Sequence, residues 1–242
     1  MNKWIIGARI KTLPAAISPV LVGTALANKI NWGNALLALV VSVSLQISVN
    51  YANDYSDGIR GTDTNRVGPT RLVGSGLASA QSVKVAMFIS FGIAAIAGLI
   101  LAIQTSYWLL LIGAVSILAA WGYTGGRKPY GYFGFGEISV FIFFGLVATV
   151  GSYYVQSKDI SARSILLSIP IGALACAILV MNNLRDLPLD SQVGKRTLSV
   201  RIGDTNTRYF YVFLLVTAQL FSAYAYTFNS YALLTLIWPP LS

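Results

Sequence analysis

Long uncharged runs recur along this chain and constrain its fold more than any other feature. Residues 34–51 and 164–183 carry no charged side chain, and each is close to the roughly 20 residues that a helix needs to cross a bilayer. Charged residues make up only 10% of the chain, against about 25% in a soluble domain. The sequence therefore predicts an all-α, polytopic transmembrane helical bundle, with residues 1–242 forming one domain.

The spacing of the apolar runs predicts about seven complete spans. We expect them at residues 13–28, 34–52, 83–103, 106–124, 136–155, 164–182 and 209–227. A last apolar piece, residues 231–237, is too short to cross a membrane. We therefore expect an eighth helix to begin there without being completed.

Positive charges alternate between successive loops and predict the orientation. The N-terminus and the loops at 53–84, 125–135 and 183–208 hold 14 of the 17 Lys and Arg residues. Such an alternation is typical of a protein with its N-terminus in the cytoplasm. It also explains the net charge of +9 without a nucleic-acid partner. The expected surroundings are the lipid bilayer of a bacterial or archaeal cell membrane, with no obligatory protein partner.

Three of the eight acidic residues follow the uncharged run at 34–51 within ten positions: Asp54, Asp57 and Asp63. On a helix, Asn50, Asp54 and Asp57 are four and seven residues apart and fall on one face. A row of carboxylates where an apolar helix meets water needs a cation. Taken alone, such a cluster could equally be a solvated loop or a set of helix caps.

A second polar element repeats the first. Asn182 and Asp186 again follow a long uncharged run with a spacing of four, and Asp190 adds a carboxylate four residues further on. Four predicted spans separate the two elements, so both lie at the same membrane face. Pro188 lies between the aspartates, and we expect the helix to kink or end there. Charged groups near membrane depth are costly and usually functional, so the matched pair favours a binding site.

Composition limits which cation these carboxylates can hold. The chain has no His and one Cys, Cys176, which lies in an apolar run where core packing is the expected role. A metal must therefore be held by oxygen, as Mg²⁺, Ca²⁺ and Mn²⁺ are. Five carboxylates suit two or more Mg²⁺ ions that also bind a diphosphate. Basic side chains then complete the phosphate shell; the candidates are Arg60, Arg71, Lys128, Arg185, Lys195 and Arg196. Any one of these basic residues can instead be a loop charge that sets topology.

These residues resemble the UbiA superfamily of intramembrane prenyltransferases. Its two signatures stand here as Asn53-Asp54-x-x-Asp57 and Asp186-x-x-x-Asp190. The likeness is closer to the 1,4-dihydroxy-2-naphthoate polyprenyltransferases of menaquinone synthesis. It is carried by residues 11–16, 63–76, 123–137 and 182–203 and covers about residues 9–205.

The resemblance implies a bundle of nine helices in which aspartates bind Mg²⁺ and the diphosphate of a polyprenyl donor. By position, the metal ligands are Asp54, Asp57, Asp186 and Asp190, of which Asp57 and Asp190 also count as catalytic. The same match of position places Asn50 and Asn182 among the residues that bind the diphosphate. Asp63 is our candidate for the base that accepts the phenolic proton. Asn53, Tyr123 and Tyr153 are expected in the substrate pocket, where ring faces can stabilise a carbocation. The sequence departs from the family in ending before helices eight and nine and in having Pro188 inside the second motif.

The expected reaction is Mg²⁺-dependent transfer of a polyprenyl group to 1,4-dihydroxy-2-naphthoate, with loss of the ring carboxylate as CO₂. Two alternatives stay open. Another ring, such as 4-hydroxybenzoate or homogentisate, could be the acceptor, since motif residues do not identify the ring. A cation or phosphate transporter could also use membrane aspartates, although its charges are expected near the bilayer midplane and in inverted repeats.

Overall fold

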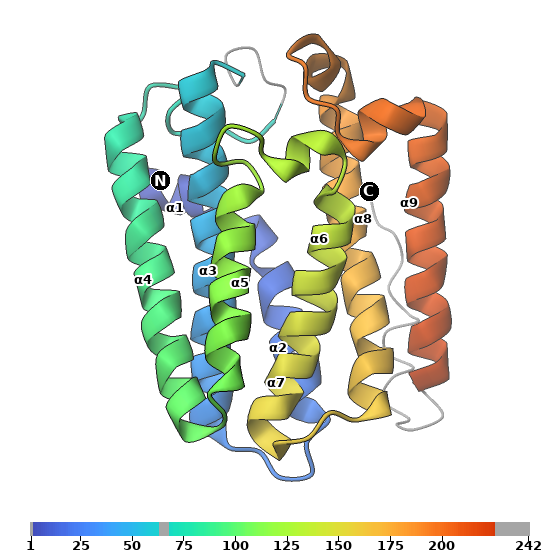
Figure 1. The fold of residues 1–242 in the computed structure, drawn as a ribbon. Helices are drawn as coiled ribbons and strands as arrows, with labels where there is room; N and C mark the ends of the chain where they lie inside the picture. The colour runs from blue at the N-terminus through green and yellow to red at the C-terminus, as the bar shows by residue number, and fades with distance from the viewer. Residues whose placement is uncertain (1, 63–67, 226–242) are drawn as a thin grey trace.

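The computed structural model describes residues 2–62 and 68–225, and within these ranges all regular structure is helical (Figure 1). The all-α prediction is therefore confirmed. In chain order the elements are α1 Lys3–Ala8, η1 Ile10–Thr12, α2 Pro14–Ala25, α3 Trp32–Arg60, α4 Ala80–Gln104, α5 Trp108–Gly122, η2 Tyr130–Phe133, α6 Gly136–Val140, η3 Phe141–Val147, α7 Ala148–Ser157, α8 Ala162–Gln192 and α9 Leu198–Ala225. The η3 segment is a π-helix that joins α6 to α7.

Four helical segments of the described chain are long and apolar enough to cross a membrane: α3, α4, the continuous stretch Gly136–Ser157, and α8. The segments Lys3–Thr12 and Pro14–Ala25 are bent by 51° where they join, and they make a fifth span if the bent pair is counted as one. The helix α5 is apolar but has 15 residues, and α9 is broken at Gly203. The expected count of seven spans is therefore not confirmed, and the apolar piece at 231–237 lies outside the described residues.

The helices α3 and α8 extend further than their apolar runs. They end at Arg60 and Gln192, eight and ten residues beyond the spans expected at 34–52 and 164–182, and the added turns carry the buried carboxylates Asp54, Asp57 and Asp186. Gly61, with φ of 71°, ends α3 in a left-handed conformation that glycine adopts without strain. The helix α8 continues through Pro188, where we expected it to kink or end, and stops four residues later at Gln192.

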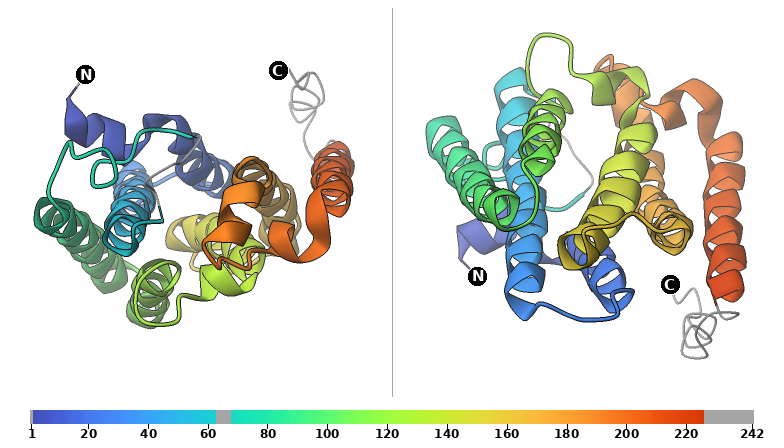
Figure 2. Two further views of the ribbon diagram at one scale, coloured as in Figure 1. Left: turned by 90° about the horizontal axis from the view of Figure 1, so that it is seen from above. Right: turned by 60° about the horizontal axis from the view of Figure 1, so that its bottom comes forward.

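Small residues let the helices approach closely, as is common in membrane bundles. The strongest packing joins α3 to α4 on one side and α8 to α9 on the other, with α2 against α7 between them (Figures 1 and 2). In the α8–α9 core the buried residues are small on the α8 side, where Ala173, Cys176 and Ala177 pack against Leu214 and Ala218. The sequence prediction that Cys176 is a packing residue agrees with this position.

The contact between α2 and α7 depends on Gly23. A Cβ atom at this position would lie 2.2 Å from the backbone oxygen of Thr149 and 2.8 Å from Cβ of Ser152. Gly23→Ala is therefore expected to separate the two helices and to destabilise the protein by about 1–3 kcal/mol, as overpacking does. Thermal unfolding in detergent measures this effect.

The control for Gly23 is Gly113→Ala in α5, where an added Cβ meets no atom within 4 Å. Because alanine favours a helix over glycine by about 0.5–1 kcal/mol, this variant should unfold at the same or a higher temperature. Equal unfolding temperatures for the two variants would contradict the proposed contact.

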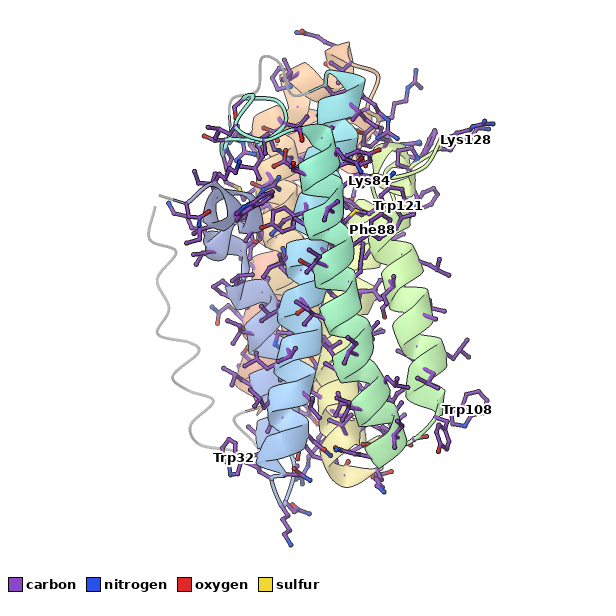
Figure 3. All side chains as sticks on the ribbon, turned by 90° about the vertical axis from the view of Figure 1, so that its left-hand side faces the viewer. Trp32, Lys84, Phe88, Trp108, Trp121 and Lys128 are labelled. Carbon is purple, nitrogen blue, oxygen red and sulfur yellow. The ribbon has the colours of Figure 1, made fainter. Side chains whose placement is uncertain are left out.

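The bundle has two distinct ends. At one end, Trp32 and Trp108 are 74% and 73% exposed, next to the short loops at 26–31 and 105–107 (Figure 3). Exposed tryptophans at helix ends are typical of a membrane–water interface. The ends of α3 and α8 and the longer loops meet at the opposite end (Figure 1). Both aspartate elements therefore lie at that second end, as the span count between them predicted.

Candidate functional site

A polar pocket of about 150 Å³ lies where α3, α8 and the loops between helices meet. Three carboxylates and four basic side chains line it among the described residues: Asp57, Asp186, Asp190, Arg9, Arg71, Arg185 and Lys195. Amide and hydroxyl groups complete the wall: Thr12, Asn53, Tyr123, Thr124, Tyr132, Asn182, Asn183 and Thr197. The two predicted aspartate elements are thus part of one cavity.

Asp57 is a buried, ion-paired carboxylate of the pocket and is 2% exposed. Its Oδ2 lies 3.1 Å from Nζ of Lys195 and 3.8 Å from Nη2 of Arg71. The hydroxyl of Tyr132 donates a hydrogen bond to Oδ1. Burying a carboxylate is costly unless charge partners and hydrogen bonds compensate for lost water, and Asp57 has both. Because Arg71 and Lys195 are also buried, this end of the pocket has two cations at a fixed position.

Tyr132 reaches Asp57 from η2, in the loop between α5 and α6. Burial, and then the nearby charge of Asp57, raise the pKa of its phenol well above the usual range. The phenol is therefore protonated at neutral pH and donates to Asp57. Nζ of Lys195 also lies 4.7 Å from the centre of the Tyr132 ring, so the ring and its hydroxyl contact both members of the ion pair.

The second aspartate element lies on the last turns of α8. Arg185 binds Asp186 through two hydrogen bonds, from Nε to Oδ1 at 2.8 Å and from Nη2 to Oδ2 at 2.9 Å. Both side chains line the pocket together with Asp190 and Asn182. The continuation of α8 past Pro188 is what keeps Asp190 on the helix. The arrangement therefore brings carboxylates of α3 and α8 to the wall of one cavity.

The structure places Asp54, which the motif predicts as a metal ligand, outside the wall of the pocket. It is fully buried, and its Oδ2 and Oδ1 accept hydrogen bonds from the backbone amides of Leu72 and Val73 at 2.8 and 3.1 Å. It does not line the pocket. Asp54 and Asp57 are three residues apart, which is a rotation of about 300° around the helix axis. The two side chains therefore leave α3 in directions about 60° apart, and only one of them reaches the pocket. In this structure Asp54 holds the segment after Arg71 against α3.

Two other predicted ligands also bind protein atoms and do not themselves line the pocket. Asn50 donates from Nδ2 to the carbonyl of Ala8 at 2.9 Å and to Oγ1 of Thr12 at 3.0 Å. Arg60 donates to the carbonyls of Thr124 and Gly126 at 2.6 and 2.5 Å. Asn50 thus anchors the N-terminal segment, and Arg60 anchors the loop after α5. Neither side chain lines the pocket.

The remaining predicted residues divide between the pocket and other places. Asn53 and Tyr123 line it, and Oδ1 of Asn53 accepts a hydrogen bond from Oγ1 of Thr124 at 2.7 Å. Lys128 and Arg196 are exposed in loops and do not line it. Tyr153 lies on α7 near the opposite end of the bundle, since Gln156 one turn later bonds the backbone N–H of Asn31. Asp63 lies outside the described residues.

Four residues of this region were missed from the sequence: Arg9, Tyr132, Glu137 and Asn183. Arg9 and Asn183 line the pocket, as Tyr132 does. Glu137 is 5% exposed, and its Oε1 accepts a hydrogen bond from Nδ2 of Asn183 at 2.9 Å. Tyr132 and Glu137 belong to the stretch 131–137 that carried the family resemblance, and that resemblance could have pointed to them as site residues. Arg9 and Asn183 had none beyond their proximity to predicted residues.

The pocket suits a hard cation only together with an anionic ligand. In the described part of the chain, no group of three or more His, Cys, Asp or Glu side chains is close enough to hold a metal by itself. The pocket does offer carboxylate oxygens from Asp57, Asp186 and Asp190. Mg²⁺ typically takes one or two carboxylates and completes its shell with water and substrate phosphates. The oxygen-only donor set therefore fits Mg²⁺ bound with a phosphate-bearing substrate.

The fold and the site define a class of protein: an integral membrane helical bundle with a charged, ion-paired pocket at one end. A family model described as "UbiA prenyltransferase family" matches residues 16–242. The chain belongs to the UbiA prenyltransferase family.

Two relatives show where the chain lies within this family. It is 49% identical to the 1,4-dihydroxy-2-naphthoate octaprenyltransferase of Mycobacterium tuberculosis, over 99% of this chain and 83% of the relative. It is 40% identical to the Escherichia coli protein of the same name, over 88% of this chain and 72% of the relative. Both relatives carry the name of an aromatic polyprenyltransferase.

A solved structure has the same fold. It is a UbiA homolog from Archaeoglobus fulgidus, bound to GPP and Mg²⁺, which superposes with a TM-score of 0.72 over 97% of this chain and 86% of that chain. The sequences are 13% identical, so the likeness concerns the fold alone. The predicted UbiA-like bundle is therefore confirmed.

Proposed function

We propose that this chain transfers a polyprenyl group from polyprenyl diphosphate to 1,4-dihydroxy-2-naphthoate, in a reaction that requires Mg²⁺. The names of two relatives at 49% and 40% identity support the reaction and the acceptor. The observation that carries the proposal is the pocket itself, whose wall contains both the buried pair of Asp57 and Lys195 and the Arg185–Asp186 pair of α8. Such a site offers cations to a diphosphate and carboxylates to the metal ions that accompany it.

The basic side chains are the proposed ligands of the diphosphate. Arg71 and Lys195 have little exposed surface, and a charge held in a water-poor site interacts more strongly than one in solution. Arg185 offers a planar guanidinium that can bind phosphate oxygens in pairs. Asp57, Asp186 and Asp190 would hold Mg²⁺, which when bound neutralises charge that develops on the departing diphosphate. Asp54 is no longer among the proposed ligands, because both its oxygens bind backbone amides.

The proposed chemistry breaks the bond between the allylic carbon and the diphosphate oxygen, which keeps the electron pair. The electron-rich ring then forms a bond to that carbon at the position of its carboxylate. The electrons of the carbon–carboxylate bond return to the ring as CO₂ leaves, so prenylation replaces the carboxyl group. Preorganised cations around the diphosphate lower the barrier of the first step. Asp63, outside the described residues, stays our candidate for the base that accepts a phenolic proton.

The proposed location of the site is the cytoplasmic face of a cell membrane. The N-terminus and the loops at 53–84, 125–135 and 183–208 carry most of the Lys and Arg residues, and such loops face the cytoplasm in most membrane proteins. Both substrates would then reach the pocket from the side where water-soluble precursors are made. The polyprenyl tail is expected to extend from the pocket into the bilayer.

A direct assay tests the function. Purified protein in lipid nanodiscs is given polyprenyl diphosphate, Mg²⁺ and dihydroxynaphthoate labelled at its carboxyl carbon. We expect equal amounts of labelled CO₂ and prenylated naphthoquinol, and no turnover after EDTA, with recovery when Mg²⁺ is restored. Parallel reactions with 4-hydroxybenzoate and homogentisate identify the acceptor, and faster turnover with either ring would replace dihydroxynaphthoate in the proposal.

A further inference from the structure

A second hollow lies on the outer side of the bundle, between α3, α4 and α5, at the same end as the polar pocket. Its volume is about 500 Å³. The wall is mainly apolar and includes Phe88, Phe91, Leu118 and Trp121. Phe88 and Leu118 are 56% and 69% exposed, so the hollow opens to the surroundings of the bundle. We call it the α4–α5 groove.

The groove is basic at its outer end and apolar further in. Lys84 is on the first turns of α4, and Phe88 and Phe91 follow it four and seven residues later on one helix face. Over these seven residues the helix rises about 10 Å. Figure 3 shows Lys84, Phe88 and Trp121 close together at the upper end of α4 and α5, away from Trp32 and Trp108. A phospholipid meets the same order of environments, first polar and then apolar, from its headgroup to its acyl chain.

The charge of the groove has one sign. Arg60 and Lys84 line it, and none of the described lining residues is acidic. Nζ of Lys84 lies 5.7 Å from the centre of the Tyr55 ring, and no ion pair joins it to a described carboxylate. An ammonium beside an aromatic wall suits an anion attached to an apolar chain. The absence of carboxylates from this wall also separates it from the metal-binding chemistry proposed for the pocket.

Arg60 separates the groove from the pocket. Its guanidinium binds the carbonyls of Thr124 and Gly126 and lies 5.3 Å from the centre of the Tyr132 ring. Tyr132 in turn donates to Asp57 inside the pocket. Arg60 lines the groove and Tyr132 lines the pocket, so these two side chains stand between the two cavities.

We infer that the α4–α5 groove binds an anionic phospholipid, with the headgroup phosphate at Lys84 and an acyl chain along Phe88, Phe91 and Trp121. The position at the rim of the bundle favours a lipid over a soluble ligand. The single sign of its charge favours an anionic headgroup over a zwitterionic one. The inference is independent of the reaction proposed for the pocket.

Competition between two lipids tests the inference. Native mass spectrometry of the whole chain in detergent, with equal amounts of phosphatidylglycerol and phosphatidylcholine of identical acyl chains, gives the ratio of the two bound adducts. We expect phosphatidylglycerol to predominate. Lys84→Gln should lower the ratio about fivefold, the effect of one basic residue near an anionic headgroup. The control is Lys29→Gln, an exposed lysine at the other end of the bundle, which should leave the ratio unchanged.

Two further experiments test whether the charge at position 84 and the acyl chain of the lipid are both needed. Lys84→Arg keeps the charge and should give the same ratio as the unchanged chain. That result would show that the ratio depends on the charge at position 84 and not on the lysine side chain being replaced. Glycerol 3-phosphate at the same concentration should not displace the bound lipid. A ratio near one in the unchanged chain, an unchanged ratio in Lys84→Gln, or displacement by glycerol 3-phosphate would overturn the inference.

Discussion

Asp57→Asn is expected to lower kcat by about 10²–10³-fold, the loss seen when one electrostatic contact at a reacting centre is removed. Asp57 is the carboxylate that pairs with Lys195 and Arg71 and accepts the Tyr132 hydroxyl. An amide in its place cannot balance two buried cations and is a weak ligand for Mg²⁺. Turnover of dihydroxynaphthoate in nanodiscs measures the effect.

Two further variants separate lost chemistry from lost folding. Removing one partner of a buried ion pair costs about 3–5 kcal/mol, so Asp57→Asn also destabilises the protein. Asp57→Asn combined with Lys195→Met removes both charges and should recover thermal stability without recovering turnover. Asp204→Asn, which removes an exposed partner of Arg208, should change neither property. Turnover of Asp57→Asn within about threefold of the unchanged chain would remove Asp57 from the reacting centre, because that loss corresponds to well under 1.4 kcal/mol of barrier.

The sequence predicted which carboxylates lie close together where its information is local. Asp57, Asp186 and Asp190 follow long apolar runs, and an apolar run of known length determines at which membrane face its end lies. That reasoning placed both elements at one end of the bundle, and the structure has all three residues in one pocket. Lys195 was found because it follows the second element within a few residues.

The sequence could not distinguish Asp54 from Asp57, and the reason is long-range folding. Leu72, fully buried in the core formed with Tyr51 and Met87, draws the segment after α3 back onto that helix. This places two backbone N–H groups beside Asp54, and helical spacing alone contains no sign of them. Tyr132 is likewise 75 residues from its partner Asp57. Contacts of this kind depend on how loops return to the bundle.

Helix ends were the least predictable part of the fold for a related reason. Hydropathy detects the part of a helix that lies in lipid, whereas backbone hydrogen bonds continue the helix into water. The last turns of α3 and α8 contain Asp57 and Asp190 and were expected in loops at 53–84 and 183–208. The starts follow local polar caps: Asn31, Ser79 and Ser161 each accept a hydrogen bond from a backbone N–H three residues later.

Asp54→Asn is expected to reduce stability by about 3 kcal/mol, since hydrogen bonds to a charged group contribute about 1.5–3 kcal/mol each. An asparagine has one oxygen for the two N–H groups of Leu72 and Val73, and its own NH₂ would face the second donor. The loss should appear as a lower unfolding temperature and faster proteolysis at 68–79. Turnover should fall as well, because Arg71 precedes these amides and would move away from Asp57.

The Mg²⁺ dependence of the remaining turnover decides between an anchor and a ligand. If Asp54 anchors the segment after Arg71, Asp54→Asn lowers the maximal rate and leaves the Mg²⁺ concentration for half-maximal turnover unchanged. If Asp54 were a metal ligand, as its motif alone predicts, that concentration would rise about 10-fold or more while the unfolding temperature stayed the same, as for the loss of one coordinating group. Asp186→Asn is the matched comparison, since Asp186 lines the pocket and its loss should raise the Mg²⁺ requirement. A rise for Asp54→Asn as large as that for Asp186→Asn would assign Asp54 to the metal. The loss of hydrogen bonds to two backbone amides would not by itself raise the Mg²⁺ requirement.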